Sequence, residues 1–223
     1  MDGDGTTVDA DVVVVGAGPV GLMLAAELRL AGGAPVVLER LAEPTSEPRA
    51  RGVGPLAAEA LGRRGLGARL TEYQPKAHAD RTRDHGSEKG HFAWIHKIDP
   101  ARQEEPERTG ALIWQPDLER ILGEYLAGLG VPVRRAHTVT GVDRQSDGIT
   151  VTVRTPQGER RISAAYLVGC DGGRSTVRKL TGFDFPGTPP TMTVRHAAAD
   201  LADPEKLPPS GRTPTGSLLI AHR

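Results

Sequence analysis

Three glycines near the start of the chain have the spacing of a nucleotide-binding turn. Gly16, Gly18 and Gly21 form the pattern Gly-x-Gly-x-x-Gly between a run of β-branched residues and a helical pattern. In that context the first glycine permits a tight turn, the second lets a pyrophosphate approach the backbone, and the third lets helix and strand pack closely. The free N–H groups and partial positive charge of the helix N-terminus would hold the pyrophosphate.

An acidic residue stands where such a site needs one. Glu39 follows the second short apolar run, and its carboxylate can accept hydrogen bonds from both hydroxyls of an adenosine ribose. A carboxylate there disfavours a 2′-phosphate, which argues against NADP at this position. The βαβ unit alone does not separate FAD from NAD, because both contain the ADP half that it recognises. The alternative, a glycine-rich turn that binds nothing, is the less favoured interpretation.

Hydrophobic patterning indicates the elements that would position these residues. Residues 8–15 predict a buried parallel strand, 19–31 a helix and 36–38 a second strand. Downstream, the patterns predict a helix over 49–61 with Pro55 at its start and Leu56 on its apolar side, an amphipathic helix over 115–129, an antiparallel meander within 131–168, a buried strand over 165–168 and a short helix near 175–180.

Four segments together resemble the aromatic-ring hydroxylase branch of the group A flavoprotein monooxygenases, similar to the p-hydroxybenzoate hydroxylase family. They are VVVVGAGPVGLMLAAELRLAG with Glu39 and Arg40, then PRARGV, then the helix that starts at Gln115, and finally YLVGCDGGRSTVRKLTGFDFPG. The acidic start and the GFDFPG segment look most like bacterial hydroxylases that act on aromatic polyketides.

The resemblance implies a set of cofactor-binding residues. The first motif, with Pro19 and Val20, would hold the ADP part of FAD. Arg49 and Gln115 would contact FAD, and the motif of Asp171 and Gly172 would lie near FAD and NADPH. Taken without the resemblance, Asp171 could instead cap the helix near Ser175, and Arg49 and Gln115 could be solvated surface side chains.

The implied fold is α/β, an FAD-binding Rossmann-like βαβ domain with an antiparallel meander and the beginning of a mixed substrate-domain sheet. Expected boundaries are a disordered tail over 1–7, an FAD-binding domain over 8–185 in which 70–110 contribute to the substrate side, and an incomplete substrate domain over 186–223. A later Gly-Asp segment, GDAAH in the family, binds the flavin part of FAD and is not found in these residues.

The expected function is that of an FAD-dependent monooxygenase that uses NADPH or NADH to hydroxylate a small phenolic or polyketide-like substrate. No catalytic side chain is assigned, because in the family the reduced cofactor activates oxygen. The alternatives are a shortened, catalytically silent relative, one half of an enzyme completed by another chain, and an NAD-linked dehydrogenase without flavin. The expected partners are a small aromatic substrate and either a complementing chain or further copies of this chain in a homo-oligomer.

Composition restricts the other classes of function. Lys plus Arg and Asp plus Glu both number 28, so no overall charge favours nucleic acid or an anionic membrane. No apolar run approaches the roughly 20 residues that span a bilayer. The single Cys170 excludes an internal disulfide framework, which favours the cytoplasm. Four histidines, His78, His85, His91 and His96, lack paired ligand spacing, so no metal site is expected.

Overall fold

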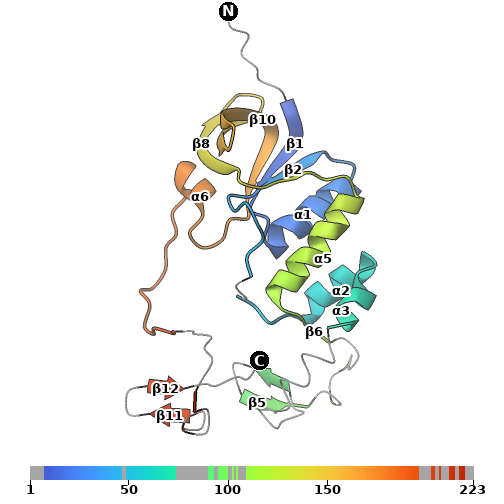
Figure 1. Cartoon of the computed structure of the whole chain (residues 1–223), viewed down its shortest axis with the longest axis vertical. Helices are drawn as coiled ribbons and strands as arrows, with labels where there is room; N and C mark the ends of the chain where they lie inside the picture. Colours follow the sequence, from blue (N-terminus) through green and yellow to red (C-terminus); the bar gives the residue numbers. More distant parts are fainter. Residues whose placement is uncertain are drawn as a thin grey trace, which may run out of the picture. The chain divides into compact units, whose positions relative to one another are not determined.

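The computed structural model describes residues 8–46, 49–73, 90–92, 95–99, 102, 104, 109–195, 202–203, 206, 211–213 and 216–218. The chain divides into two compact units, Met1–Gln74 with Glu107–Asp184 and Pro75–Pro106 with Phe185–Arg223. Figure 1 labels the elements of both units. The tail predicted over 1–7 lies outside the described residues.

A six-stranded mixed sheet forms the centre of the first unit. Its order is β7-β2-β1-β10-β9-β8, in which β7, β2, β1 and β10 run parallel while β10, β9 and β8 run antiparallel. The sheet confirms the predicted α/β class with its meander. The strands are β1 (Val8–Val15), β2 (Pro35–Leu38), β7 (Val133–Arg134), β8 (Thr138–Arg144), β9 (Ile149–Thr155) and β10 (Gly158–Gly169).

Strand β10 joins the meander to the parallel strands. Its first half, 158–164, pairs with β9, and its second half, 163–169, pairs with β1. The prediction of a separate buried strand over 165–168 is therefore wrong. Tyr166 is 69% exposed, because β9 no longer flanks β10 beyond Ala164 and the side chains there have fewer neighbours.

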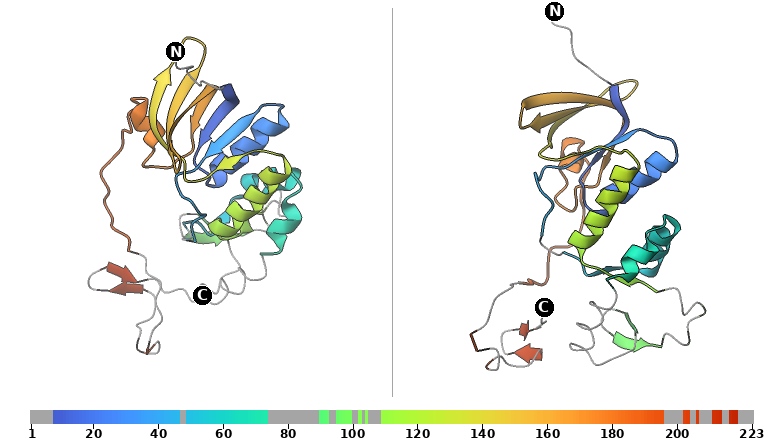
Figure 2. Two further views of the ribbon diagram at one scale, coloured as in Figure 1. Left: turned by 45° about the horizontal axis from the view of Figure 1, so that its top comes forward. Right: turned by 45° about the vertical axis from the view of Figure 1, so that its right-hand side comes forward.

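Two predicted helices, α1 (Pro19–Leu30) and α5 (Gln115–Gly128), pack against each other over one face of the sheet, as Figures 1 and 2 show. Helix α1 ends where Gly32 adopts a φ of +91° and donates to a carbonyl of the last turn. The shared core includes Val14, Leu22, Ala25, Ile121 and Leu122. A second core lies between β1, β2 and the meander and includes Val13, Val36, Val151, Val153 and Ile162.

The helix predicted over 49–61 begins only at Pro55. Residues 52–53 form the short strand β3 (Gly52–Val53), which pairs antiparallel with β6 (Ala111–Leu112), and α2 spans Pro55–Arg63. The ring of a proline disfavours helical backbone in the preceding residue, and Gly54 is extended. Leu56 is 71% exposed, whereas Leu61 is buried, so the predicted apolar side of this helix is only partly correct.

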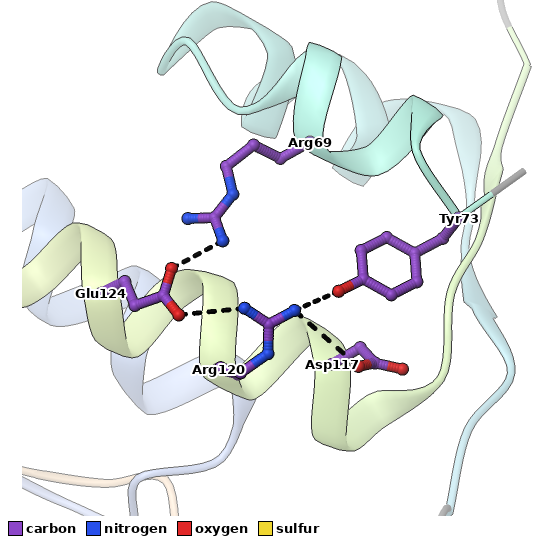
Figure 3. Close-up of polar contacts among 5 residues, drawn as sticks. All are labelled: Arg69, Tyr73, Asp117, Arg120 and Glu124. Atoms are coloured by element: carbon purple, nitrogen blue, oxygen red, sulfur yellow. Dashed lines mark hydrogen bonds and ion pairs between the residues drawn. The ribbon is translucent and has the colours of Figure 1, made fainter.

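A network of polar contacts links α3 (Gly67–Thr71) to α5. Arg69 and Arg120 both form ion pairs with Glu124, at 2.6 and 2.9 Å, and Arg120 also contacts the Tyr73 hydroxyl and Asp117 (Figure 3). The bonds from Arg69 and Arg120 lower the pKa of Glu124. The ion pairs of Glu124 therefore stabilise the folded chain fully above the ordinary pKa of a glutamate carboxyl group. This stabilisation is lost as the pH falls through the lowered pKa of Glu124.

Removal of the Glu124 charge is expected to have a small effect that depends on salt. Its side chain is 50% exposed, so solvent screens the pairs with both arginines. The variant Glu124→Gln should lower the thermal midpoint slightly at low salt and not at all near ~1 M NaCl, where screening is nearly complete. Thermal unfolding followed by circular dichroism checks this, and a large loss that persists in salt would contradict it.

The remaining elements are short. Helix α6 (Thr176–Leu180) follows β10 in the first unit. In the second unit β4 (Gly90–Phe92) pairs with β5 (Ile95–Ile98), and β11 (Gly211–Thr213) pairs with β12 (Gly216–Leu218). The assignment of these segments to a substrate domain stays a prediction. Among the helices that the structure describes, none is long and apolar enough to cross a membrane.

Candidate functional site

Two of the three glycines in the turn after β1 are required by the packing of the chain itself. Gly16 has a φ of +106°, and a Cβ there would lie 2.5 Å from the Cys170 carbonyl oxygen. A Cβ on Gly21 would lie 1.9 Å from the Gly16 carbonyl oxygen. Both contacts are with backbone, which has little freedom to move away. Gly16 therefore permits the turn and Gly21 lets α1 approach it, as the spacing predicts.

Gly18 differs from its two neighbours in the turn. Its backbone is extended, with φ −74° and ψ 176°, which any residue adopts, and a Cβ there would meet only the Glu119 Oε1, at 4.0 Å. Gly18 is the N-cap of α1 and makes no side-chain cap bond, so the first N–H groups of the helix have no such acceptor. The space beside Gly18 is thus free for an anionic ligand at the helix N-terminus.

Glu39, directly after β2, reaches the same turn. Its carboxylate accepts hydrogen bonds from the backbone N–H groups of Ala17 and Leu41, each at 2.9 Å. Its own backbone is fixed by bonds with Arg134 and His137. Each carboxylate oxygen has two lone pairs, so the side chain can accept further bonds from the hydroxyls of a ribose. Arg40, the next residue, is exposed.

Arg49 and Gln115 lie close together, although they are far apart in sequence. The pairing of β3 with β6 continues where the Gln115 N–H donates to the Ala50 carbonyl at 3.0 Å, one residue from Arg49. Arg49 is exposed, and the Arg51 guanidinium lies 4.6 Å from the centre of the Trp114 ring, within the range of a cation–π contact. Arg49 and the start of α5 are thereby held side by side.

Glu119 links α5 to the glycine turn, and the motif analysis did not select it. Its side chain is only 8% exposed, it accepts a hydrogen bond from the Gln115 Nε2 at 2.7 Å, and it is the nearest group to the space at Gly18. The spacing of four from Gln115 places both on one face of the helix and is the signal that could have found it. Pro19 and Val20 form the first turn of α1 at this place, and Val20 is 70% exposed.

Asp171 bonds the start of α6. Its Oδ2 accepts hydrogen bonds from the Thr176 and Val177 N–H groups, and its Oδ1 accepts one from the Ser175 hydroxyl. The N-cap residue of α6 is Ser175, whose hydroxyl accepts from the Arg178 N–H at 3.0 Å, so Asp171 bonds the start of the helix without being its N-cap. The segment still borders the glycine turn, because the Asp171 Cα would lie 3.1 Å from a Cβ on Gly16. Gly172 continues it with a φ of +79°. A role near a bound cofactor stays a prediction.

Cys170 is half-buried beside the turn, and burial, helped by the charge of Asp171, raises the pKa of its thiol. The thiolate is the nucleophilic form, so Cys170 is expected to react slowly with iodoacetamide at neutral pH in the folded chain and much faster in urea. Mass spectrometry of the alkylated protein over time would measure both rates. Equal rates in the folded and unfolded chains would contradict the geometry.

The structure therefore brings three of the four segments to the first turn of α1, while the fourth, around Arg49, lies beside Gln115. Glu39 bonds the turn directly, Cys170 and Asp171 pack against Gly16, and Gln115 reaches it through Glu119. Within the described part of the chain, no group of three or more His, Cys, Asp or Glu residues could hold a metal ion. The arrangement offers helix N–H donors for a diphosphate and a carboxylate for a ribose, the contacts needed by an adenine dinucleotide.

The chain is similar to known proteins in sequence and in fold. A Streptomyces rimosus protein named 12-dehydrotetracycline 5-monooxygenase/anhydrotetracycline 6-monooxygenase is 43% identical to this chain, over 89% of this chain and 37% of that protein. The anhydrotetracycline hydroxylase structure from Streptomyces rimosus matches with a TM-score of 0.69 at 42% identity, over 81% of this chain and 35% of the other. Aklavinone-11 hydroxylase, solved with FAD and aklavinone, matches with a TM-score of 0.64 at 26% identity, over 79% and 35% of the two chains.

The matches cover most of this chain but only part of each relative. The chain spans little more than a third of the length of these relatives. The family described as the FAD binding domain matches residues 9–212, a range that contains the glycine turn, Glu39, Gln115 and the Asp171 segment. The chain therefore belongs to the FAD binding domain family.

Proposed function

We propose that this chain supplies the FAD-binding part of a monooxygenase that hydroxylates an aromatic, polyketide-like substrate with NADPH or NADH as reductant. The observation that carries the proposal is the space at Gly18, which a Cβ could enter without a clash and which lies at an uncapped helix N-terminus. Relatives named as monooxygenases or hydroxylases of tetracycline compounds and of aklavinone support the substrate class.

The residues around this space fit the ADP half of FAD. The diphosphate would lie at the N-terminus of α1 beside Gly18, where it would accept bonds from the free N–H groups of the first turn. Glu39 would accept hydrogen bonds from the ribose hydroxyls while it keeps its bonds with Ala17 and Leu41. Gln115 and Arg49, held together at the start of α5, would contact the same cofactor.

The chemistry would come from the flavin, which supplies oxygen activation once the nicotinamide cofactor has reduced it. The part of this chain in that reaction is to bind and orient. Glu39 and the turn would fix the adenosine end, so that the flavin end has a defined position relative to the substrate. Cys170 keeps its proton at neutral pH because its pKa is raised, so it would not compete as a nucleophile.

Labelled oxygen tests the proposed reaction. The monooxygenase of which this chain is the proposed FAD-binding part is loaded with FAD and incubated with NADPH or NADH, an anthracyclinone or tetracycline-type aromatic substrate and ¹⁸O₂, and the product is analysed by mass spectrometry. The proposal expects substrate-stimulated oxidation of the reductant and a product that contains one labelled oxygen atom. The variant Gly18→Ala, which is expected to keep the fold, serves as the control and should lose both signals together.

Two results would count against the proposed reaction. If a substrate product forms without labelled oxygen, the site supports a different transformation. If the chain takes up no FAD and NADH is consumed by hydride transfer to a substrate, the chain is a nicotinamide-linked dehydrogenase.

A further inference from the structure

The carboxylate of Glu119 is a buried charge beside a site for an anion. Glu119 is 8% exposed and is the one buried charged residue among the residues that the structure describes. It takes part in none of the ion pairs formed by those residues. Burial of a carboxylate without a cationic partner costs free energy, and a negative charge near Gly18 works against a diphosphate. The interaction that offsets this cost in the structure is the hydrogen bond that Glu119 accepts from Gln115.

That hydrogen bond fixes the direction of the Gln115 side chain. A carboxamide has a donor end and an acceptor end, and half a rotation exchanges them. An ionised carboxylate only accepts, so the Gln115 Nε2 must face the Glu119 Oε1, at 2.7 Å. The Gln115 carbonyl oxygen is then directed away from Glu119. Because α5 holds the two residues one turn apart, the pair needs no other element to align it.

We propose that Glu119 is a positioning residue of the FAD site, which holds the Gln115 carboxamide in the one orientation that meets the cofactor. This inference rests on the proposed function. It assigns Glu119 no contact with the reacting atoms. Its effect on FAD binding passes through Gln115, so the effect should vanish when Gln115 is removed.

A double-mutant cycle tests this dependence. The four proteins are the unaltered chain, Glu119→Gln, Gln115→Ala and the double variant, each titrated with FAD by the quenching of flavin fluorescence. Glu119→Gln keeps the size of the side chain but lets either end of the Gln115 carboxamide face it. It should weaken FAD binding about threefold to tenfold, the range for one hydrogen bond. In the Gln115→Ala background it should have no effect.

A second carboxylate on α5, that of Glu124, provides the control. Glu124→Gln removes a carboxylate from the same helix, far from the turn, and should bind FAD as the unaltered chain does. Circular dichroism of each variant confirms that it folds. Equal weakening in both backgrounds would show a general structural role and overturn the proposal, as would unchanged or tighter binding by Glu119→Gln. Failure of the unaltered chain to bind FAD would overturn the proposed function as well, which separates the two failures.

Discussion

The variant Gly21→Ala is expected to destabilise the chain by roughly 1–3 kcal/mol or more, the cost of forcing extra atoms into a packed core. A Cβ at this position would lie 1.9 Å from the Gly16 carbonyl oxygen and 3.2 Å from the Cys170 side chain. The first contact is with backbone that the turn already constrains, so α1 must move away from β1. Urea unfolding followed by circular dichroism would measure the loss.

The matched control is the same substitution in another helix. Gly123 lies inside α5, and a Cβ there would meet nothing within 4 Å. Because alanine favours the helix over glycine, Gly123→Ala should stabilise the chain by up to about 1 kcal/mol. Two identical substitutions are thus expected to have opposite signs. If Gly21→Ala were as stable as the unaltered chain, the close approach of α1 to the turn would be incorrect.

The variant Gly18→Ala is expected to lose FAD binding while it keeps its fold. A methyl group fits here, since its nearest neighbour would be the Glu119 Oε1 at 4.0 Å, and alanine at a helix N-cap costs only about 1 kcal/mol. The same methyl group would occupy the space through which a diphosphate approaches the backbone. FAD affinity should fall tenfold or more, equivalent to about 1.4 kcal/mol of binding free energy.

Parallel titrations with FAD and with urea would separate these two effects. The expected pattern is nearly unchanged unfolding together with weak FAD binding, the reverse of a general loss of structure. Full FAD affinity in Gly18→Ala would mean that the cofactor does not approach the chain at this turn. Unfolding of the variant would mean that the chain itself requires glycine at position 18.

Local patterns in the sequence were sufficient for the βαβ unit and for α5. Strand β1 is confirmed over Val8–Val15, and both helices begin at their predicted residues, Pro19 and Gln115. In each of these elements the apolar residues recur at regular spacing, and a glycine or proline in the same segment marks where the element begins or ends. The backbone reasons for Gly16 and Gly21 followed from the same motif, because the turn and the close packing involve neighbours in the chain.

Features that depend on distant segments could not be predicted. Residues 52–53 form a strand because they pair with 111–112, nearly sixty residues later, and no local pattern reveals that pairing. The exposure of Tyr166 depends on where β9 stops flanking β10. Glu119 resembles any helical glutamate in the sequence, and only the packing of α5 against α1 encloses it beside Gly18.

Comparison of FAD with FMN is the test that bears on the cofactor site as a whole. FMN contains the flavin but lacks the adenosine half that Gly18 and Glu39 are placed to hold. Equilibrium dialysis of the chain against each flavin, read from the visible spectrum of the retained protein, should show near-stoichiometric FAD that ADP displaces, and little FMN. Retention of neither flavin, or of both equally, would contradict an adenosine-directed FAD site at this turn.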